Sequence, residues 1–256
     1  MDFRYHILKK TGFSFYSNET AGMTLEFIGT SGVGKTTLYR ETMARLRNRW
    51  FFAHQLDFIK RKAPPSVKDR VLMEILKSRI DKIINSEAYC PWHSLLDLKL
   101  SVRVIHETMI TVHSSHPQGF VFDEGLFRHF PAEILLYGKD FPVQLWQNRA
   151  FVYLRARSPE TALARLKSRT MSLAQIAVQR EITDEQLLAR IIHDQEMFQS
   201  IVGRASSFGC PVLVLDAEDP LMDSINKVLN FEKSLHQKFS EQKEMKTNSK
   251  PRTLTE

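Results

Sequence analysis

The sequence predicts an α/β protein in which a parallel sheet is covered by helices on both faces. Short, nearly continuous apolar segments alternate along the chain with longer segments of helical periodicity. Strands of this kind are typical of parallel sheets, because their strands are buried on both faces and are joined by helices. A glycine-rich loop at residues 29–36 separates the first predicted strand from the first predicted helix. In such sheets ligands bind beyond the carboxyl ends of the strands.

Five segments have the apolar character of buried strands. The third of them ends in two carboxylates, Asp123 and Glu124, and the fifth is the run Pro-Val-Leu-Val-Leu-Asp. The predicted strands are residues 24–28, 54–58, 119–125, 150–155 and 211–216.

Helical segments separate the predicted strands. Apolar residues recur at three- and four-residue spacing from Val67 to Ile84 and from Leu95 to Val112, as on one face of a helix. Ser158 followed by Pro159 is typical of a helix start. The predicted helices cover residues 37–46, 67–84, 94–114, 184–206 and 219–239, with a further helix beginning at 158 and a break at 89–92.

Length and composition favour one domain with short additions at its ends. The chain has 256 residues, of which 43% are hydrophobic and 25% charged, as expected of a globular core. Residues 1–21 are expected to form an N-terminal arm and residues 22–239 the folded domain. Residues 240–256 are polar without apolar periodicity and are expected to be disordered. The net charge of +7 favours anionic ligands but does not choose among them.

The expected location is the cytoplasm. No apolar run approaches the ~20 residues that a membrane span needs, and the first ten residues lack the pattern of a secretory signal. The two cysteines, Cys90 and Cys210, are expected to be free thiols in a reducing compartment.

The glycine loop predicts a site for a nucleoside triphosphate. It matches the pattern G-x-x-x-x-G-K-[ST] and has the required context of a strand before it and a helix after it. Backbone N–H groups of such a loop surround phosphates, and the helix start adds partial positive charge. Lys35 is expected to reach the β- and γ-phosphates and Thr36 to hold Mg²⁺. The predicted nucleotide-binding residues are Gly29, Thr30, Ser31, Gly32, Val33, Gly34, Lys35, Thr36 and Thr37.

The carboxylates at the end of the third strand are the next candidate site residues. In a protein with a phosphate loop, an acid in this position meets the Mg²⁺–phosphate centre. Asp123 is predicted to hold Mg²⁺ or to accept a proton from an attacking hydroxyl, and Glu124 is an alternative for either role. Arg128 is predicted to bind an anionic group of the acceptor, although a surface arginine fits the sequence nearly as well.

Arginines later in the chain favour a basic lid over the phosphates. Arg165 and Arg169 are four residues apart and share a helix face, and Arg180 and Arg190 follow. A lid at about residues 165–190 would neutralise the charge of a transferring phosphoryl group and exclude water.

Taken together, the motifs resemble those of P-loop nucleoside and nucleotide kinases, especially thymidylate-kinase-like and deoxynucleoside-kinase-like proteins. The resemblance rests on residues 29–37, 120–125, 151–169 and 211–216. It implies a P-loop NTPase fold of three layers, with a five-stranded parallel sheet of order 2-3-1-4-5 and a helical lid. It further implies ATP and Mg²⁺ as cofactors at Lys35 and Thr36, lid roles for Arg165 and Arg169, and a loop after Leu215 near the adenine.

One departure leaves the acceptor open. Thymidylate kinases usually have an Asp-Arg pair after the third strand, where this chain has Asp123-Glu124. Residues 57–116 match no acceptor-binding pattern, so the acceptor can be a nucleoside, a nucleotide, a sugar or another small alcohol. The oligomeric state is also open, with a homodimer among the alternatives.

Two other functions remain as alternatives to a small-molecule kinase. Asp followed by Glu is common in NTP-hydrolysing motors and switches, but the chain has neither Leu-Ser-Gly-Gly-Gln nor Asn-Lys-x-Asp. The positive charge and the basic loop at 60–62 suggest a nucleic-acid-end kinase, but no aromatic and basic recognition motif supports binding to nucleic acid.

Overall fold

The sheet has the architecture that the sequence predicts. The computed structural model describes residues 23–46, 50–52, 66–85, 91–113, 119–168 and 183–248. Within them, five strands pair in parallel in the order β2-β3-β1-β4-β5, which confirms the predicted order 2-3-1-4-5. The strands are β1 (Thr24–Ile28), β2 (Phe51–Phe52), β3 (Phe120–Phe122), β4 (Arg149–Arg155) and β5 (Val212–Asp216).

The second strand begins ahead of its predicted position. It lies at residues 51–52, while the predicted segment 54–58 falls outside the described residues and stays a prediction. Phe51 and Phe52 pair with Phe120 and Val121 of β3. Two adjacent aromatic residues have no alternation for a sequence pattern to detect, and it is the pairing with β3 that makes them a strand.

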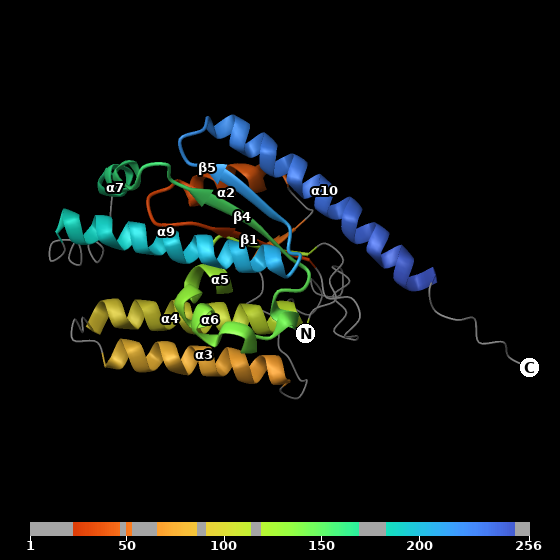
Figure 1. Ribbon diagram of the computed structural model, residues 1–256, viewed down its shortest axis with the longest axis horizontal. Helices are drawn as coiled ribbons and strands as arrows, with labels where there is room; N and C mark the ends of the chain where they lie inside the picture. Colours follow the sequence, from red (N-terminus) through yellow and green to blue (C-terminus); the bar gives the residue numbers. More distant parts are fainter. Residues whose placement is uncertain are drawn as a thin grey trace, which may run out of the picture.

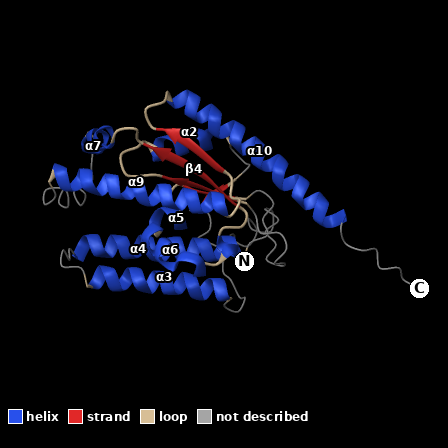
Figure 2. Cartoon of the chain, viewed as in Figure 1, coloured by secondary structure: helices blue, strands red, loops and turns tan. Residues whose placement is uncertain are grey.

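Helices cover both faces of the sheet (Figures 1 and 2). Helices α2 and α10 pack on one face, while α9 and α5 contact the other, with α4 beyond α5 and α3 outermost. No helix in the described ranges has the length and hydropathy of a membrane span. The helices are α2 (Lys35–Arg45), α3 (Val67–Ile84), α4 (Pro91–Val112), α5 (Leu126–His129), α6 (Pro131–Tyr137), α7 (Pro159–Lys167), α9 (Asp184–Ser207) and α10 (Leu221–Asn248).

Two hydrophobic cores result, one on each side of the sheet. The first joins Leu25 and Phe27 of β1 to residues of α2 and α10, such as Leu38 and Val228. The second contains Ile28 of β1, residues of α3 and α4, and an aromatic group that surrounds Phe127. Because successive strand residues point to opposite faces, Glu26 of β1 lies on the side of the second core.

Several helix boundaries differ from the predictions. Helix α4 starts at Pro91, inside the predicted break, because proline is well suited to the first position of a helix. Helix α10 continues to Asn248, nine residues beyond the predicted end at 239. The two short helices α5 and α6 were not predicted, since a helix of one or two turns has too little periodicity to detect. The predicted arm at 1–21 lies outside the described residues.

The start of α3 is held by a capping box that makes stability depend on pH. Ser66 Oγ accepts the N–H of Asp69, and Asp69 Oδ2 accepts the N–H of Ser66 at 2.6 Å. Asp69 Oδ1 also lies 2.9 Å from His113 Nε2, at the end of α4. Burial raises the pKa of Asp69, but the hydrogen bonds from Ser66 and His113 together lower it by a larger amount. The pKa of Asp69 therefore lies below its ordinary value of 3.8.

We expect Asp69→Ala to lower the free energy of unfolding by about 1 kcal/mol at pH 7, the usual contribution of a cap. A carboxyl with a depressed pKa stabilises the fold above its unfolded pKa of 3.8, and this stabilisation is lost as the pH falls through the folded value. The free energies of unfolding of the variant and the wild type are compared by thermal unfolding from pH 7 to pH 3. The difference between them should become smaller below pH 4. Asp81→Ala, at an exposed position of the same helix, is the control. A difference that stays constant with pH would contradict the role of the carboxylate.

Candidate active site

The loop between β1 and α2 has the shape of a phosphate-binding site. Gly32 and Gly34 have φ of +87° and +88°, the left-handed region that favours glycine. A Cβ on Gly32 would lie 2.2 Å from the carbonyl oxygen of Ala162, so this side of the loop packs on α7. A Cβ on Gly34 would meet no atom within 4 Å, so the loop is open there. The loop is thus held on one side and accessible on the other.

The N-cap residue of α2, Gly34, has no side chain that could accept a hydrogen bond from the first N–H groups of the helix. Helices α3, α7 and α9 begin at Ser66, Ser158 and Thr183, whose hydroxyls accept a backbone N–H, and each has an acidic residue in its first turn. Helix α2 begins after Gly34 with no side-chain cap and no acidic residue in its first turn. The free donors and the helix dipole make this end of α2 suitable for an anion.

Lys35 and Asp123 lie together at this helix end, as predicted from the two motifs. Lys35 Nζ is 3.4 Å from Asp123 Oδ1, although the residues are 88 positions apart. Lys35 is buried, with 6% of its surface exposed. Burial lowers the pKa of Lys35 and Arg128 lowers it further, while Asp123 and Glu124 act in the opposite direction. The ammonium therefore lies in a site that a polyphosphate would stabilise electrostatically.

The other predicted loop and carboxylate residues differ in exposure. Asp123 keeps 22% of its side chain exposed, and Glu124, the next residue, is exposed. Thr36 is half-buried in the first turn of α2, and Thr37 is exposed. Asp123 is therefore the carboxylate that meets Lys35, while Glu124 faces solvent beside it.

Arg128 lies between the phosphate loop and α9. Its backbone belongs to α5, and its guanidinium carbon lies 5.3 Å from the centre of the Phe198 ring. Its Nε is buried and has no hydrogen-bond partner among the described residues. Arg128 also lowers the pKa of Lys35, so the charges of the two side chains repel each other.

A half-buried carboxylate that the sequence did not reveal lies near Arg128. Burial raises the pKa of Asp194, on α9, while Arg128, Arg190, His193 and Arg79 act in the opposite direction. These groups come from three helices, so no local pattern indicates that they meet. The predicted acceptor residue Arg128 thus packs on an aromatic ring of α9 and interacts electrostatically with a carboxylate of the same helix.

The structure gives Arg165 a partner in the turn that follows β5. Its Nη1 donates to the carbonyl oxygen of Ala217 at 3.0 Å, which joins α7 to the turn between β5 and α10. The same turn is held by Asp216, which accepts from Arg155 at 2.7 Å and from Arg157 at 3.0 Å. Arg169 and most of the predicted lid lie outside the described residues, so their roles stay predictions.

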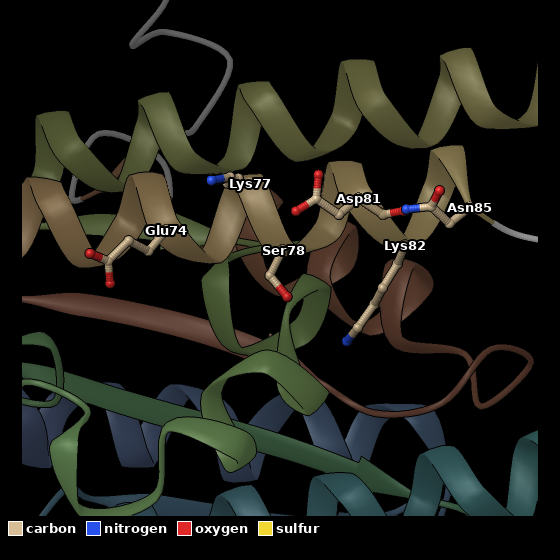
Figure 3. A pocket seen from close by; sticks show the side chains of 6 residues that line it. All are labelled: Glu74, Lys77, Ser78, Asp81, Lys82 and Asn85. Atoms are coloured by element: carbon tan, nitrogen blue, oxygen red, sulfur yellow. The ribbon is translucent and has the colours of Figure 1, made fainter.

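A pocket of about 450 Å³ lies elsewhere, along α3 (Figure 3). Its lining residues all belong to α3 or to its C-cap, and in the figure they point to different sides of this one helix. None of them is a predicted site residue, so the pocket is not the candidate active site. They are Glu74, Lys77, Ser78, Asp81, Lys82 and Asn85.

Substitution of Gly32 and of Gly34 is expected to lower the free energy of unfolding by different amounts. Alanine at Gly34 has to adopt the left-handed conformation, which costs about 1–2 kcal/mol. Alanine at Gly32 has the same cost and also collides with the Ala162 carbonyl, for which overpacking adds about 1–3 kcal/mol. We therefore expect Gly32→Ala to lower the denaturation midpoint clearly more than Gly34→Ala, as measured by urea unfolding. Equal midpoints would contradict the packing of the loop on α7.

Comparison with known proteins finds similarity only among solved structures. No protein-family model and no curated protein matches the chain. A deoxyadenosine kinase from M. mycoides is similar with a TM-score of 0.41 and 17% identity, over 83% of this chain and 100% of that one. A gluconokinase from Sinorhizobium meliloti has a TM-score of 0.40 and 14% identity, over 88% and 99% of the two chains. A shikimate kinase from Bacteroides thetaiotaomicron has a TM-score of 0.39 and 14% identity, over 83% of this chain and 99% of that one.

All three of these proteins are kinases, the class that the sequence motifs resemble. Similarities of this size do not transfer an activity from one protein to another. The function is therefore inferred from the phosphate loop, the sheet order and the charged side chains of this chain itself.

Proposed function

We propose that the protein is an ATP-dependent small-molecule kinase, which transfers the γ-phosphoryl group to a hydroxyl or phosphate of a nucleoside, nucleotide or sugar-like acceptor. The observation that carries the proposal is the pair of Lys35 and Asp123, 3.4 Å apart at the uncapped start of α2. It combines a cation for the phosphates with a carboxylate at the point where the phosphoryl group would be transferred.

The donor half of the site is formed by the loop at residues 29–37. Backbone N–H groups at the start of α2 would bind the phosphates, and Lys35 would bind the β- and γ-phosphate oxygens. The side chains fit Mg²⁺, which takes few protein ligands, prefers hard oxygens and is completed by substrate phosphates. Thr36 and Asp123 would hold the ion, which would neutralise charge on the transferring group.

The chemistry requires a base and two aligned substrates. The acceptor oxygen forms a bond to the γ-phosphorus as the bond to the β–γ bridging oxygen breaks, and ADP leaves. The acceptor proton passes to Glu124 if Asp123 holds Mg²⁺, or to Asp123 if Glu124 takes that place. Lys35 and Arg128 stabilise the negative charge on the phosphoryl oxygens, so positioning and electrostatics provide most of the catalysis.

Arg128 and Asp194 are the proposed acceptor-binding residues. A guanidinium binds anionic groups or sugar oxygens, and a carboxylate accepts hydrogen bonds from hydroxyl or amino groups. Their proximity favours an acceptor that offers both donors and acceptors, such as a nucleoside or sugar acid. Arg165 and Arg169 retain their proposed lid roles, for which Arg165 would have to leave the Ala217 carbonyl. The proposed location is the cytoplasm, in keeping with Cys210 as a buried free thiol.

A screen for acceptor-dependent ADP release tests the proposal. The full-length protein is first titrated with MgATP by calorimetry, and ADP release is then measured with nucleosides, nucleotides, sugars and sugar acids. We expect slow ATP hydrolysis without acceptor and faster ADP release with the correct one. Robust turnover that no acceptor increases would favour a hydrolysing motor or switch. Tight, salt-dependent binding to oligonucleotides with phosphorylated ends would favour a nucleic-acid-end kinase, and absence of MgATP binding would contradict all three functions.

A further inference from the structure

A charged residue lies in the middle of the sheet, where apolar side chains are normal. Glu26, on the central strand β1, has 0% of its surface exposed. Its neighbours in register are Phe122 on β3 and Phe151 on β4. Phe122 is the last residue of β3, directly before Asp123, so Glu26 lies below the turn that carries the candidate catalytic carboxylates.

The Glu26 carboxylate is bonded to the segment that follows this turn. Oε1 accepts the backbone N–H of Arg128 at 2.8 Å, and the backbone N–H of Phe127 also bonds to the carboxylate. Oε2 lies 3.4 Å from Nη1 of Arg149, a buried arginine at the start of β4. The first turn of α5 is thus capped by a side chain that is distant in sequence rather than by a residue of its own, since Gly125 offers no side chain.

Gly125 fits this carboxylate closely. A Cβ on Gly125 would lie 2.5 Å from Cδ of Glu26, and the closest heavy atoms that it would meet all belong to the Glu26 carboxylate. The φ of Gly125 is −95°, which any residue can adopt, so close packing and not backbone conformation calls for glycine here. The turn and the carboxylate are therefore in direct contact.

A buried carboxylate is costly unless its partners compensate. Burial raises the pKa of Glu26 above its usual value, although Arg149 and the N–H groups of Arg128 and Phe127 act in the opposite direction. Apolar residues of the same volume are often at least as stabilising as such a pair, so its presence calls for a role other than stability. The bonded segment leads directly from Asp123 to Arg128, which indicates what that role is.

We propose that Glu26 is a positioning residue of the phosphoryl-transfer centre: it holds the turn at 123–128 from below, so that Asp123 stays within reach of Lys35 and Arg128 faces the acceptor. The inference rests on the proposed function for the reaction that it serves, but the contact itself does not depend on that function. Glu26 would not touch either substrate, and it acts through the backbone of α5.

Hydrogen exchange and kinetics of Glu26 variants test the proposal. In Glu26→Ala, the amides of Phe127 and Arg128 should exchange about ten- to hundredfold faster, because they lose a hydrogen bond to a charged group. In Glu26→Gln, the side-chain NH₂ faces other donors, so an intermediate increase is expected. Both variants should bind ATP in the absence of Mg²⁺ with nearly wild-type affinity, since the phosphate loop is untouched. Their turnover should fall about ten- to hundredfold, because the carboxylate at 123 is misplaced.

Gly125→Ala changes the other partner of the contact between Glu26 and the turn. Alone, it should displace the turn and lower turnover as Glu26→Ala does. In the Glu26→Ala background the added Cβ has room, so its effect should be much smaller and the two substitutions should be non-additive. Should Glu26→Ala not fold, because it leaves Arg149 unpaired, Glu26→Gln and Gly125→Ala still carry the test.

Leu25→Val is the matched control, since Leu25 is equally buried on the same strand but packs in the opposite core. It should lower the melting temperature without changing exchange at residues 124–130 or turnover. The proposal would be overturned if the Glu26 variants had the same exchange rates and turnover as Leu25→Val. Additive effects of Glu26→Ala and Gly125→Ala would also overturn it. If the wild type fails to bind MgATP while exchange still rises in Glu26→Ala, the contact stands and the proposed function fails.

Discussion

Replacing Lys35 by methionine is expected to lower MgATP-dependent turnover by about a thousandfold. The ammonium is the buried cation at the start of α2, and loss of one preorganised donor to transition-state charge typically costs ~10²–10³ in rate. Methionine keeps the length and packing of the side chain, so the loss reports on charge. Steady-state ADP release with the acceptor found in the screen, or without acceptor if none is found, is the measurement.

The stability of this variant provides an independent check. Burial lowers the pKa of Lys35, so the folded state binds the proton less tightly than the unfolded state does. The resulting destabilisation applies below the folded pKa and is relieved as the pH rises to the ordinary value of 10.5. Lys35→Met should therefore melt at or above the wild-type temperature at pH 7, with a difference that narrows toward pH 10.5.

Arg40→Ala, at an exposed position of the same helix, is the control for general effects on α2. Its turnover should remain close to wild type. Full activity of Lys35→Met would contradict the assignment of the phosphate loop. An inactive variant that is also unfolded at pH 7 would contradict the electrostatic argument for its stability.

Asp123→Asn is expected to lower turnover by about a hundredfold or more in a protein that remains folded. The amide keeps the shape of the side chain but loses the charge that faces Lys35, and it cannot act as a base. Because the substitution leaves the buried Lys35 ammonium without its carboxylate, the melting temperature should also fall. Turnover is measured as a function of Mg²⁺ concentration, and the variant should need more Mg²⁺ if Asp123 holds the ion.

Glu124→Gln separates the two carboxylates that the sequence left as alternatives. Glu124 is exposed and Asp123 alone is paired with Lys35, so we expect a much smaller loss of turnover for Glu124→Gln. A larger loss for Glu124→Gln than for Asp123→Asn would reverse the assignment of the base. Equal, small losses in both variants would contradict a catalytic role for this strand end.

Much of the architecture was predictable because it depends on local patterns. The phosphate loop was found from its glycines, its lysine and the flanking elements, and four of the five strands were placed from apolar runs. Ser158 marked the start of α7, since a capping residue acts within one helical turn. The carboxylates after β3 were found because strand ends gather ligands in parallel sheets.

Contacts between residues that are distant in the sequence could not be predicted from local patterns. Strand β2 is a strand because two phenylalanines pair with β3, and its own sequence has no period to show this. The spacing that predicts a lid role for Arg165 does not show that its guanidinium bonds to a carbonyl oxygen 52 residues away. A lone glutamate inside the apolar run at 24–28 was the available signal for Glu26, but nothing nearby in the chain indicates its partners.

By itself the sequence determined the α/β class, the glycine loop and the two carboxylates at the strand end as candidate site residues. These follow from spacing, since periodicity and loop motifs act over a few residues. The tertiary structure alone decided that Asp123 rather than Glu124 meets Lys35, that Arg128 packs on the Phe198 ring, and that Glu26 accepts a backbone N–H in the segment after the turn. The contact from Glu26 to Arg128 joins residues 102 positions apart, and only packing of the whole chain brings them together.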